Sequence, residues 1–209
     1  MNAPPFRYAA LGDSTAAGYG VSAGASYAER ALGLLRRREP HATLTNLGRN
    51  GAVLRDVLSR QVPSLTSLRP GLVTVSVGAN DLWRRGAPDE FAAGLDALGR
   101  ALAALPAVAV VSNLPDLTRA PIAPMAETWL GLSLDAIARR LELFNGAFRT
   151  AAARHGFTLF DLFGATREAL VEHPEYFGPD GFHPSDEGHA AWAHGLWPVV
   201  EAALDARPR

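Results

Sequence analysis

The chain has 209 residues, of which 48% are hydrophobic and 20% are charged, and this balance excludes a disordered protein. Its formal net charge of −1 favours neither nucleic acid nor a stable membrane association as a partner. The lack of cysteine excludes disulfides, a thiol nucleophile and thiolate metal sites. This length fits one domain, and we expect residues 1–209 to form a single unit.

The N-terminal sequence MNAPPFRYAAL lacks a basic segment followed by an apolar run. No stretch of the chain approaches about 18 unbroken apolar residues. We therefore expect a cytoplasmic protein, with secretion after removal of a leader as the open alternative. The sequence does not indicate an oligomeric state.

Short apolar runs alternate with longer amphipathic segments along the whole chain. The expected strands, several of them rich in β-branched residues, are 7–11, 43–47, 72–77, 107–112 and 158–161. The expected helices between and after them are 26–38, 54–65, 88–105, 132–155 and 185–204. This alternation predicts an α/β fold with a parallel sheet and helices on both of its faces.

Ligands of such sheets bind beyond the carboxyl ends of the strands, so the segments that follow the strands carry the functional information. The first expected strand is followed by GDS, the second by NLGRNGAV and the third by VGANDLW. The segment FGPDGFHPSDEGH comes after the fifth strand, beyond a short connection. The fold prediction brings all four segments to one edge of the sheet.

The side chains in these segments have complementary chemistry. Ser14 is a hydroxyl nucleophile if a base lies near it, and the imidazole of His183 changes charge close to neutral pH and can be that base. Asp180 precedes His183 by three residues, from where its carboxylate can orient the ring and stabilise the imidazolium.

Hydrogen-bond donors suited to an oxyanion are also present. Asn80 offers a side-chain amide, and Gly48 or Gly51 offers a backbone N–H that no Cβ obstructs. Each of these segments taken alone also fits a turn, a helix cap or a loop. Their joint occurrence, each after a predicted parallel strand or near the C-terminus, indicates a hydrolytic site.

With these four blocks the sequence resembles the SGNH hydrolases, also called GDSL esterases and lipases. The blocks are ALGDSTAAGYG, TNLGRNGAV, VSVGANDLW and DGFHPSDEGHAAWA, and the likeness extends from about residue 7 to 204. The resemblance implies a three-layer α/β/α sandwich with a flavodoxin-like, five-stranded parallel sheet. Thr15 replaces the leucine of the GDSL label at a position that is not catalytic in the family.

The resemblance also implies the roles of the site residues. Ser14 would be the nucleophile, His183 the base and Asp180 its partner. The backbone N–H groups of Ser14 and Gly51 and the side-chain amide of Asn80 would form the oxyanion hole. The implied function is a serine esterase that acts on carboxylic esters through an acyl-serine intermediate, with no metal and no cofactor. The composition, which includes no membrane-binding helix, favours small esters with short acyl groups as its substrates.

Several residues near the expected site have weaker signals. Trp83 and Phe182 are candidates for substrate binding, and Met125 and Trp129 are apolar residues of the same neighbourhood. The proline-rich segment 113–129 is long for a loop and is the candidate for substrate selection. Ordinary packing is the alternative for each of these residues.

Other functions remain open. The same serine chemistry serves thioesters and the O-acetyl groups of carbohydrates, because a fold does not select among esters. From a different class, a non-catalytic flavodoxin-like module would use DSTAAG to bind a phosphate at a helix N-terminus. Such a module has no use for Asp180, His183 and Asn80 at the same edge.

Overall fold

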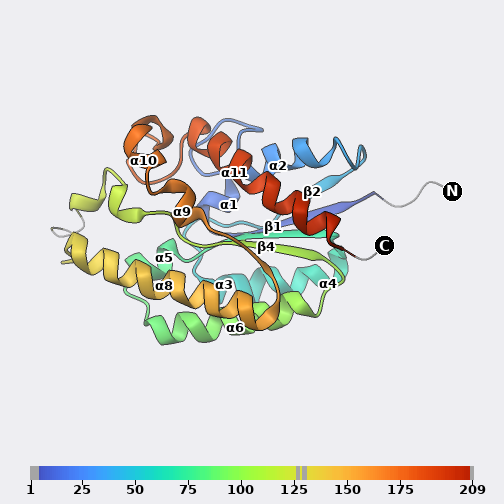
Figure 1. Ribbon diagram of the computed structural model, residues 1–209, viewed down its shortest axis with the longest axis horizontal. Coiled ribbons are helices and arrows are strands. Elements are labelled where there is room, and N and C mark those ends of the chain that lie inside the picture. The colour runs from blue at the N-terminus through green and yellow to red at the C-terminus, as the bar shows by residue number, and fades with distance from the viewer. Residues whose placement is uncertain (1–4, 126–127, 129–130, 208–209) are drawn as a thin grey trace.

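Five parallel strands form the centre of the molecule in the order β2-β1-β3-β4-β5 (Figure 1). The computed structural model describes residues 5–125, 128 and 131–207. The strands are β1 (Arg7–Gly12), β2 (Thr43–Asn46), β3 (Leu72–Ser76), β4 (Val108–Ser112) and β5 (Thr158–Phe160). Each end of each strand lies within one residue of its predicted position, which confirms the α/β fold with a flavodoxin-like sheet. The order reverses beside β1, which is the point where such sheets bind ligands.

Helices cover both faces of the sheet (Figure 1). One face carries α2 (Tyr27–Leu35) and α11 (Asp186–Asp205), and the other carries α3 (Leu54–Asp56), α4 (Leu65–Leu68), α6 (Pro88–Ala103) and α8 (Leu134–His155). The shorter helices are α1 (Ser14–Ala17), α5 (Ala79–Trp83), α9 (Leu162–Thr166) and α10 (Ala169–Glu172). Single 3₁₀ turns lie at Leu117–Arg119, Ala123–Met125 and Pro174–Tyr176. Within the described ranges, no helix has the length and apolar character needed to cross a bilayer.

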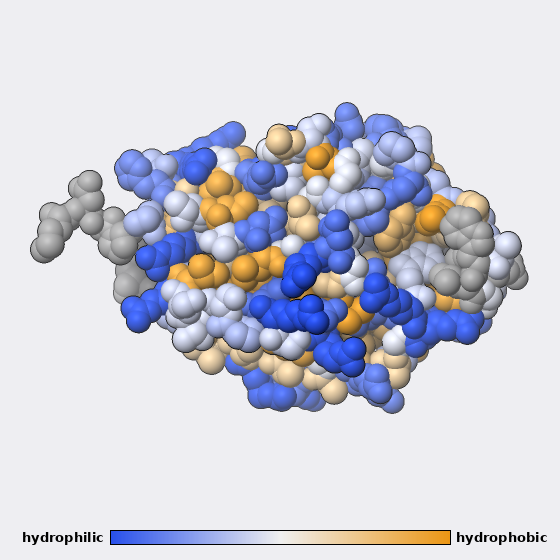
Figure 2. Space-filling view, turned by 180° about the vertical axis from the view of Figure 1, so that it is seen from behind, coloured by the Kyte–Doolittle hydropathy of each residue, from blue (hydrophilic) through white to orange (hydrophobic). Residues whose placement is uncertain are grey.

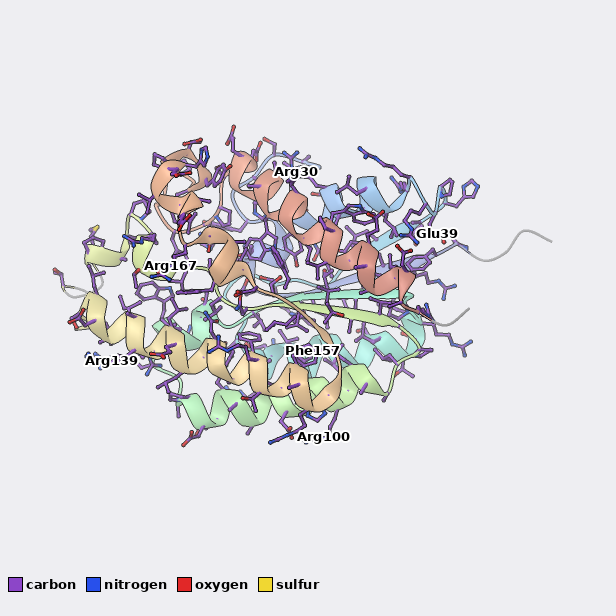
Figure 3. The ribbon with its side chains drawn as sticks, in the orientation of Figure 1. Arg30, Glu39, Arg100, Arg139, Phe157 and Arg167 are labelled. Atoms are coloured by element: carbon purple, nitrogen blue, oxygen red, sulfur yellow. The ribbon has the colours of Figure 1, made fainter. Side chains whose placement is uncertain are left out.

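Successive strand residues face opposite sides, so one buried strand supplies two cores. In β1, Ala9 and Leu11 belong to the core under α6 and α8, whereas Tyr8 and Ala10 belong to the core under α2 and α11. Phe157, which precedes β5, is buried in the first of these cores (Figure 3). Each such large apolar side chain contributes roughly 1.5–3 kcal/mol on full burial.

The outer surface mixes polar and apolar groups. Figure 2 shows, on the side opposite to the view of Figure 1, hydrophilic residues that separate several small apolar patches. That pattern is ordinary for a folded protein surface, of which more than half is contributed by apolar atoms.

The predicted helix over residues 54–65 is wrong in its details, because the segment is not one continuous α-helix. After α3 the chain forms a π-helical turn, Val57–Gln61, then a 3₁₀ turn, Val62–Ser64, and then α4. Pro63 has no N–H to donate to the preceding turn, so the α-helical hydrogen-bond pattern is interrupted there. The change of register has a consequence for the site, because Gln61 is buried against the end of β1.

Gly12 ends β1 at a point where no side chain fits. Its φ is +142°, and a Cβ placed on it would lie 1.8 Å from the carbonyl oxygen of Ser76. The next residue, Asp13, donates its backbone N–H to the same oxygen at 3.0 Å. The close approach of β1 and β3 at their carboxyl ends therefore requires glycine, and it fixes where the following residues lie.

Candidate active site

Ser14 is the first residue of α1, directly beyond the end of β1. The helix begins there because Asp13 caps it, with its Oδ1 accepting from the Thr15 N–H at 3.0 Å. It ends after one turn at Gly18, which has a φ of +76°. A short capped helix thus holds Ser14 at the edge of the sheet, where 7% of the residue's surface is exposed.

Asp13 is a buried carboxyl group beside the candidate nucleophile. Its burial is the largest cause of a pKa raised from 3.8 to about 7, and the nearby charge of Asp81 adds to the rise. The hydrogen bond from Thr15 opposes this shift. The carboxyl group therefore changes its protonation state near neutral pH, although it lies 3% exposed within the fold.

His183 reaches Ser14 across 169 residues of sequence. Its Nε2 lies 2.9 Å from the Oγ of Ser14, and its Nδ1 lies 2.5 Å from the Oδ2 of Asp180. The other carboxylate oxygen, Oδ1, accepts the backbone N–H groups of Phe182 and His183, each at 2.9 Å. Partial burial alone would raise the pKa of Asp180, but the hydrogen bonds from His183 and the two N–H groups hold it below its ordinary value.

The turn that carries His183 is fixed by its backbone. The Gly178 N–H donates to the carbonyl of His183 at 2.7 Å, and Gly181 adopts a φ of +67°. The carbonyl of Gly181 accepts the N–H of Ile122 at 3.1 Å, so the loop after β4 supports this turn from the side. Asp180 and His183 are thereby held on one rigid segment.

Three groups of the predicted oxyanion hole each keep an N–H donor that no described residue accepts. No described residue accepts a hydrogen bond from the backbone N–H of Ser14 or of Gly51. Asn80 uses one of its two side-chain N–H groups on the carbonyl of Ala52, at 3.0 Å, and keeps the other. Gly51 has a φ of +73°, a conformation that glycine adopts without strain.

The loop of Gly51 is packed against the start of α1. The Arg49 N–H donates to the carbonyl of Gly12 at 3.1 Å, and a Cβ on Gly48 would lie 2.5 Å from the Ala17 nitrogen. The Gly48 N–H is already donated to the side chain of Asn46 at 3.0 Å. Of the two glycines considered from the sequence, only Gly51 therefore has an N–H free for another acceptor among the described residues.

Aromatic rings surround the candidate base. The ring of Tyr19 lies 4.6 Å from that of His183, and Phe182 contacts the same imidazole edge-on at 4.9 Å. Trp83 packs edge-on against Phe182 at 5.8 Å. Phe182 lines a cavity next to Ser14, whereas Trp83 is not among the residues that line it. Of the two other apolar candidates, Met125 is exposed, and Trp129 lies outside the described residues.

The sequence profile of the GDSL-like Lipase/Acylhydrolase family matches residues 10–191, a range that contains the first three sequence blocks and the fourth as far as Ala191. The chain belongs to this family. The resemblance seen in the sequence is thereby confirmed, and the protein is an ester-hydrolysing enzyme.

Solved structures similar to this GDSL-like acylhydrolase share its fold at low sequence identity. LAE5, an alpha/beta hydrolase from the metagenome of Lake Arreo, is 23% identical with a TM-score of 0.73, over 98% of this chain and 97% of that one. Axe2, an acetyl xylan esterase from Geobacillus stearothermophilus, is 21% identical with a TM-score of 0.73, over 93% and 94%. The psychrotrophic esterase EstA from Pseudoalteromonas sp. is 18% identical with a TM-score of 0.73, over 95% and 98%. A comparison with the sequences of curated proteins found no match.

Two residues of this GDSL-like acylhydrolase escaped the reasoning from sequence. Tyr19 lies within the first sequence block and was given no role there, yet its ring contacts that of His183. Gln61 sits in a segment with a helical pattern, and its amide bonds both the N–H and the carbonyl of Gly12. A polar residue at a position that the apolar pattern assigns to the core was the available signal for Gln61.

Proposed function

We propose that the enzyme hydrolyses small carboxylic esters with short acyl groups through an acyl-serine intermediate. The observation that carries this proposal is the continuous hydrogen-bonded chain from the Ser14 hydroxyl through the His183 ring to the Asp180 carboxylate. Such a chain is the arrangement that makes a serine hydroxyl nucleophilic at neutral pH.

In the first half of the reaction, the Oγ of Ser14 attacks the ester carbonyl while its proton passes to Nε2 of His183. Asp180 accepts the hydrogen bond from Nδ1–H, which keeps the ring in the required tautomer and stabilises the imidazolium. The tetrahedral intermediate then collapses, its bond to the alcohol oxygen breaks, and His183 gives the proton to that leaving group. The acyl group stays on Ser14.

In the second half, a water molecule takes the place of the alcohol beside His183. The ring accepts a proton from this water as its oxygen attacks the acyl carbon, and the collapse of the second tetrahedral intermediate returns the proton to Ser14 and releases the acid. In both halves the negative oxygen would be held by the N–H groups of Ser14 and Gly51 and by the free N–H of Asn80.

Replacing the nucleophile tests the proposal. Ser14→Ala is expected to lower kcat/KM for p-nitrophenyl acetate at least about a thousandfold, because the acyl-serine cannot form. Ser22→Ala, which removes an exposed hydroxyl outside the site, is the matched control and should retain wild-type activity. Equal unfolding midpoints of the variants would show that the fold is intact, and undiminished turnover by Ser14→Ala would refute the assignment.

The substrate class is tested separately with the wild-type enzyme. Small acyl esters, an acetylated sugar and an acyl-CoA are compared by kcat/KM under the same conditions. The proposal expects the highest value for the small carboxylic esters. A higher value for the thioester or the acetylated sugar would transfer the assignment to that substrate class while leaving the serine chemistry in place.

A further inference from the structure

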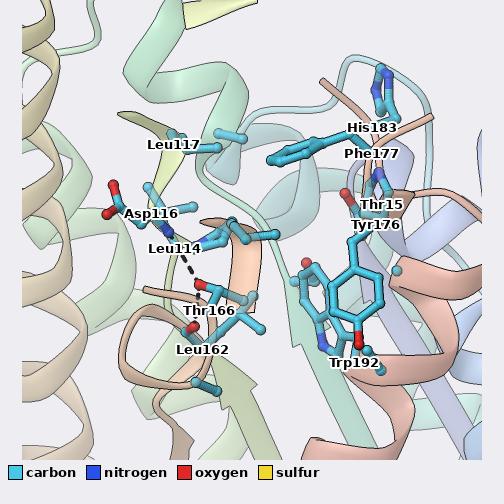
Figure 4. Close-up of a pocket in the computed structure, with 18 of the residues that line it drawn as sticks. Thr15, Leu114, Asp116, Leu117, Leu162, Thr166, Tyr176, Phe177, His183 and Trp192 are labelled. Atoms are coloured by element: carbon cyan, nitrogen blue, oxygen red, sulfur yellow. Dashed lines mark hydrogen bonds between the residues drawn. The ribbon is translucent and has the colours of Figure 1, made fainter. Parts of the chain in front are cut away.

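An apolar cavity of about 120 Å³ opens beside Ser14 and extends away from it beneath the His183 turn (Figure 4). Its floor consists of residues at the carboxyl ends of β1, β3, β4 and β5. Among them are Ser76 in β3, Asn113 directly after β4, and Phe160 in β5. One wall comes from the loop after β4 and from α9, and the opposite wall comes from the 3₁₀ turn Pro174–Tyr176 and from α11.

Two polar side chains of the cavity lining, Thr166 and Asn113, are hydrogen-bonded to protein groups. The Thr166 hydroxyl accepts the Asp116 N–H at 3.3 Å and donates to the Leu162 carbonyl at 2.6 Å (Figure 4). Asn113 donates to Asp161 at 2.7 Å and accepts the N–H of Phe163 at 3.0 Å. These groups are already paired, so an occupant of the cavity meets mainly apolar surface and gains by leaving water.

The opposite wall leaves space because its helix presents small residues. Gly188, Ala191 and Gly195 of α11 line the cavity together with Trp192 of the same helix. The Trp192 ring is buried, and its N–H has no hydrogen-bond partner among the described residues. A larger side chain at position 191 would therefore occupy the cavity itself.

We propose that this cavity is the binding site for the acyl chain of the ester, and this inference rests on the proposed function. The cavity is bordered by Ser14 and His183, but neither Gly51 nor Asn80 lines it. The acyl group stays bonded to Ser14 through both halves of the reaction, whereas the alcohol must leave His183 so that water can replace it. A recess lined by apolar groups therefore suits the acyl group, which stays on the enzyme while the alcohol leaves.

The volume sets the length of the chain. A dry apolar cavity of about 150 Å³ holds a benzene molecule, which has six carbon atoms. A cavity of about 120 Å³ therefore matches an acyl group of about four to six carbon atoms. Acetate would leave most of the cavity empty, and a decanoyl chain would extend beyond it.

A filling variant tests the site against a matched control. The values of kcat/KM are measured for p-nitrophenyl acetate, butyrate, hexanoate and decanoate. The wild type should prefer butyrate or hexanoate, and Ala191→Leu should lower the hexanoate-to-acetate ratio of kcat/KM at least tenfold. Ala202→Leu adds the same side chain at an exposed position of α11 and should leave the profile unchanged. Leu170→Ala enlarges the cavity and should shift the preference to longer chains.

Two results would overturn the inference. One is an equal effect of Ala191→Leu on all chain lengths. The other is a dependence of its effect on the size of the alcohol in a series of butyrate esters, which would assign the cavity to the leaving group.

A binding measurement separates this inference from the proposed function. Ser14→Ala protein is titrated with hexanoate by NMR, and saturable shifts at cavity residues that disappear in Ser14→Ala/Ala191→Leu support an acyl site even if no ester is turned over. Ester hydrolysis by the wild type without such shifts and without chain-length preference would leave the proposed function standing and refute the acyl site.

Discussion

The side chain of Gln61 forms two hydrogen bonds with the backbone of Gly12, accepting its N–H at 2.8 Å and donating to its carbonyl at 2.8 Å. All four groups are buried, and Gly12 is two residues before Ser14. The π-helical turn that carries Gln61 therefore holds the end of β1 at the point where the chain turns toward the candidate nucleophile. Turns of this kind are frequent at functional sites.

Gln61→Leu should destabilise the protein and weaken catalysis together. The variant keeps the volume but leaves the buried N–H of Gly12 without its acceptor, which costs about 1–3 kcal/mol of unfolding free energy. Urea unfolding and kcat for a p-nitrophenyl ester measure the two effects. Ser59→Ala, an exposed change in the same turn, is the control and should alter neither. Full activity of Gln61→Leu would show that the bonds to Gly12 do not position Ser14.

Asn80→Ala should act mainly on kcat. The free N–H of the side-chain amide is proposed to hold the oxyanion, and losing one such donor typically lowers kcat by about 10²–10³. The bond to the Ala52 carbonyl is lost as well, and unfolding by urea measures that smaller structural effect. Asn50→Ala, an exposed change beside Gly51, should keep wild-type kcat. A rise in KM with an unchanged kcat would contradict the assignment to the oxyanion hole.

The buried carboxyl of Asp13 should make stability depend on pH. Its pKa is raised from 3.8 to about 7, so between these values the folded protein holds a proton that the unfolded chain has lost. The contribution of Asp13 to the unfolding free energy is complete below about pH 4. It is lost as the pH rises through 7, at about 1.4 kcal/mol per pH unit.

Asp13→Asn is expected to remove this pH-dependent loss of stability, because an amide does not titrate. Its oxygen can still accept the Thr15 N–H, so the helix cap is kept. The difference in unfolding free energy between the variant and the wild type should grow in favour of the variant from pH 5 to pH 7. Asp89→Asn, at an exposed position, should give a difference that does not change with pH. A constant difference for Asp13→Asn would show that Asp13 has an ordinary pKa.

His189 should make the unfolding free energy depend on pH in the direction opposite to Asp13. The ring is fully buried, and its Nδ1 accepts the Tyr27 N–H at 3.0 Å, a bond that only the unprotonated nitrogen can accept. Burial, helped by the charge of Arg30 at the junction of α2 and α11 (Figure 3), lowers the pKa of His189 from 6.5 to about 4. Between pH 6.5 and 4 the unfolded chain binds a proton that the folded protein excludes. The contribution of His189 to stability is therefore complete above about pH 6.5 and is lost as the pH falls toward 4.

The effect of His189 is best measured in the Asp13→Asn protein, where the opposite contribution is absent. In that background, unfolding free energy should decrease from pH 6.5 to pH 4, and adding His189→Gln should flatten the decrease. His194→Gln changes an exposed histidine of the same helix and should not. An unaltered slope with His189→Gln would assign the acid sensitivity to other groups.

The sequence predicted the sheet well because buried parallel strands are short runs with a distinctive composition, such as LVTVS in β3. It also predicted that Ser14 and His183 would lie at one edge, since the carboxyl ends of parallel strands share that edge. The spacing alone did not show whether Gly48 or Gly51 has a backbone N–H available for the oxyanion. Their difference depends on the side chain of Asn46, which occupies the Gly48 N–H.

Other features depend on packing between distant segments and leave no local pattern. The contact of Tyr19 with His183 joins two loops, and the cavity requires small residues of α11 to face the loop after β4. The role of Gln61 depends on the π-helical turn Val57–Gln61, which a helical period does not reveal. These features arise from tertiary structure, and the sequence holds a local signal only for Gln61, as a polar residue at a core position of the apolar pattern.

The hydrogen bond from Ile122 to Gly181 has a consequence for engineering the enzyme. The loop after β4 forms a wall of the cavity through residues such as Leu114 and Leu117, and the same loop supports the turn that carries Asp180 and His183. The proposed acyl site and the turn that carries the candidate base therefore share one supporting loop. A loop transplanted from a relative to change selectivity should bring its own histidine turn with it, so that the two segments are exchanged as one cassette.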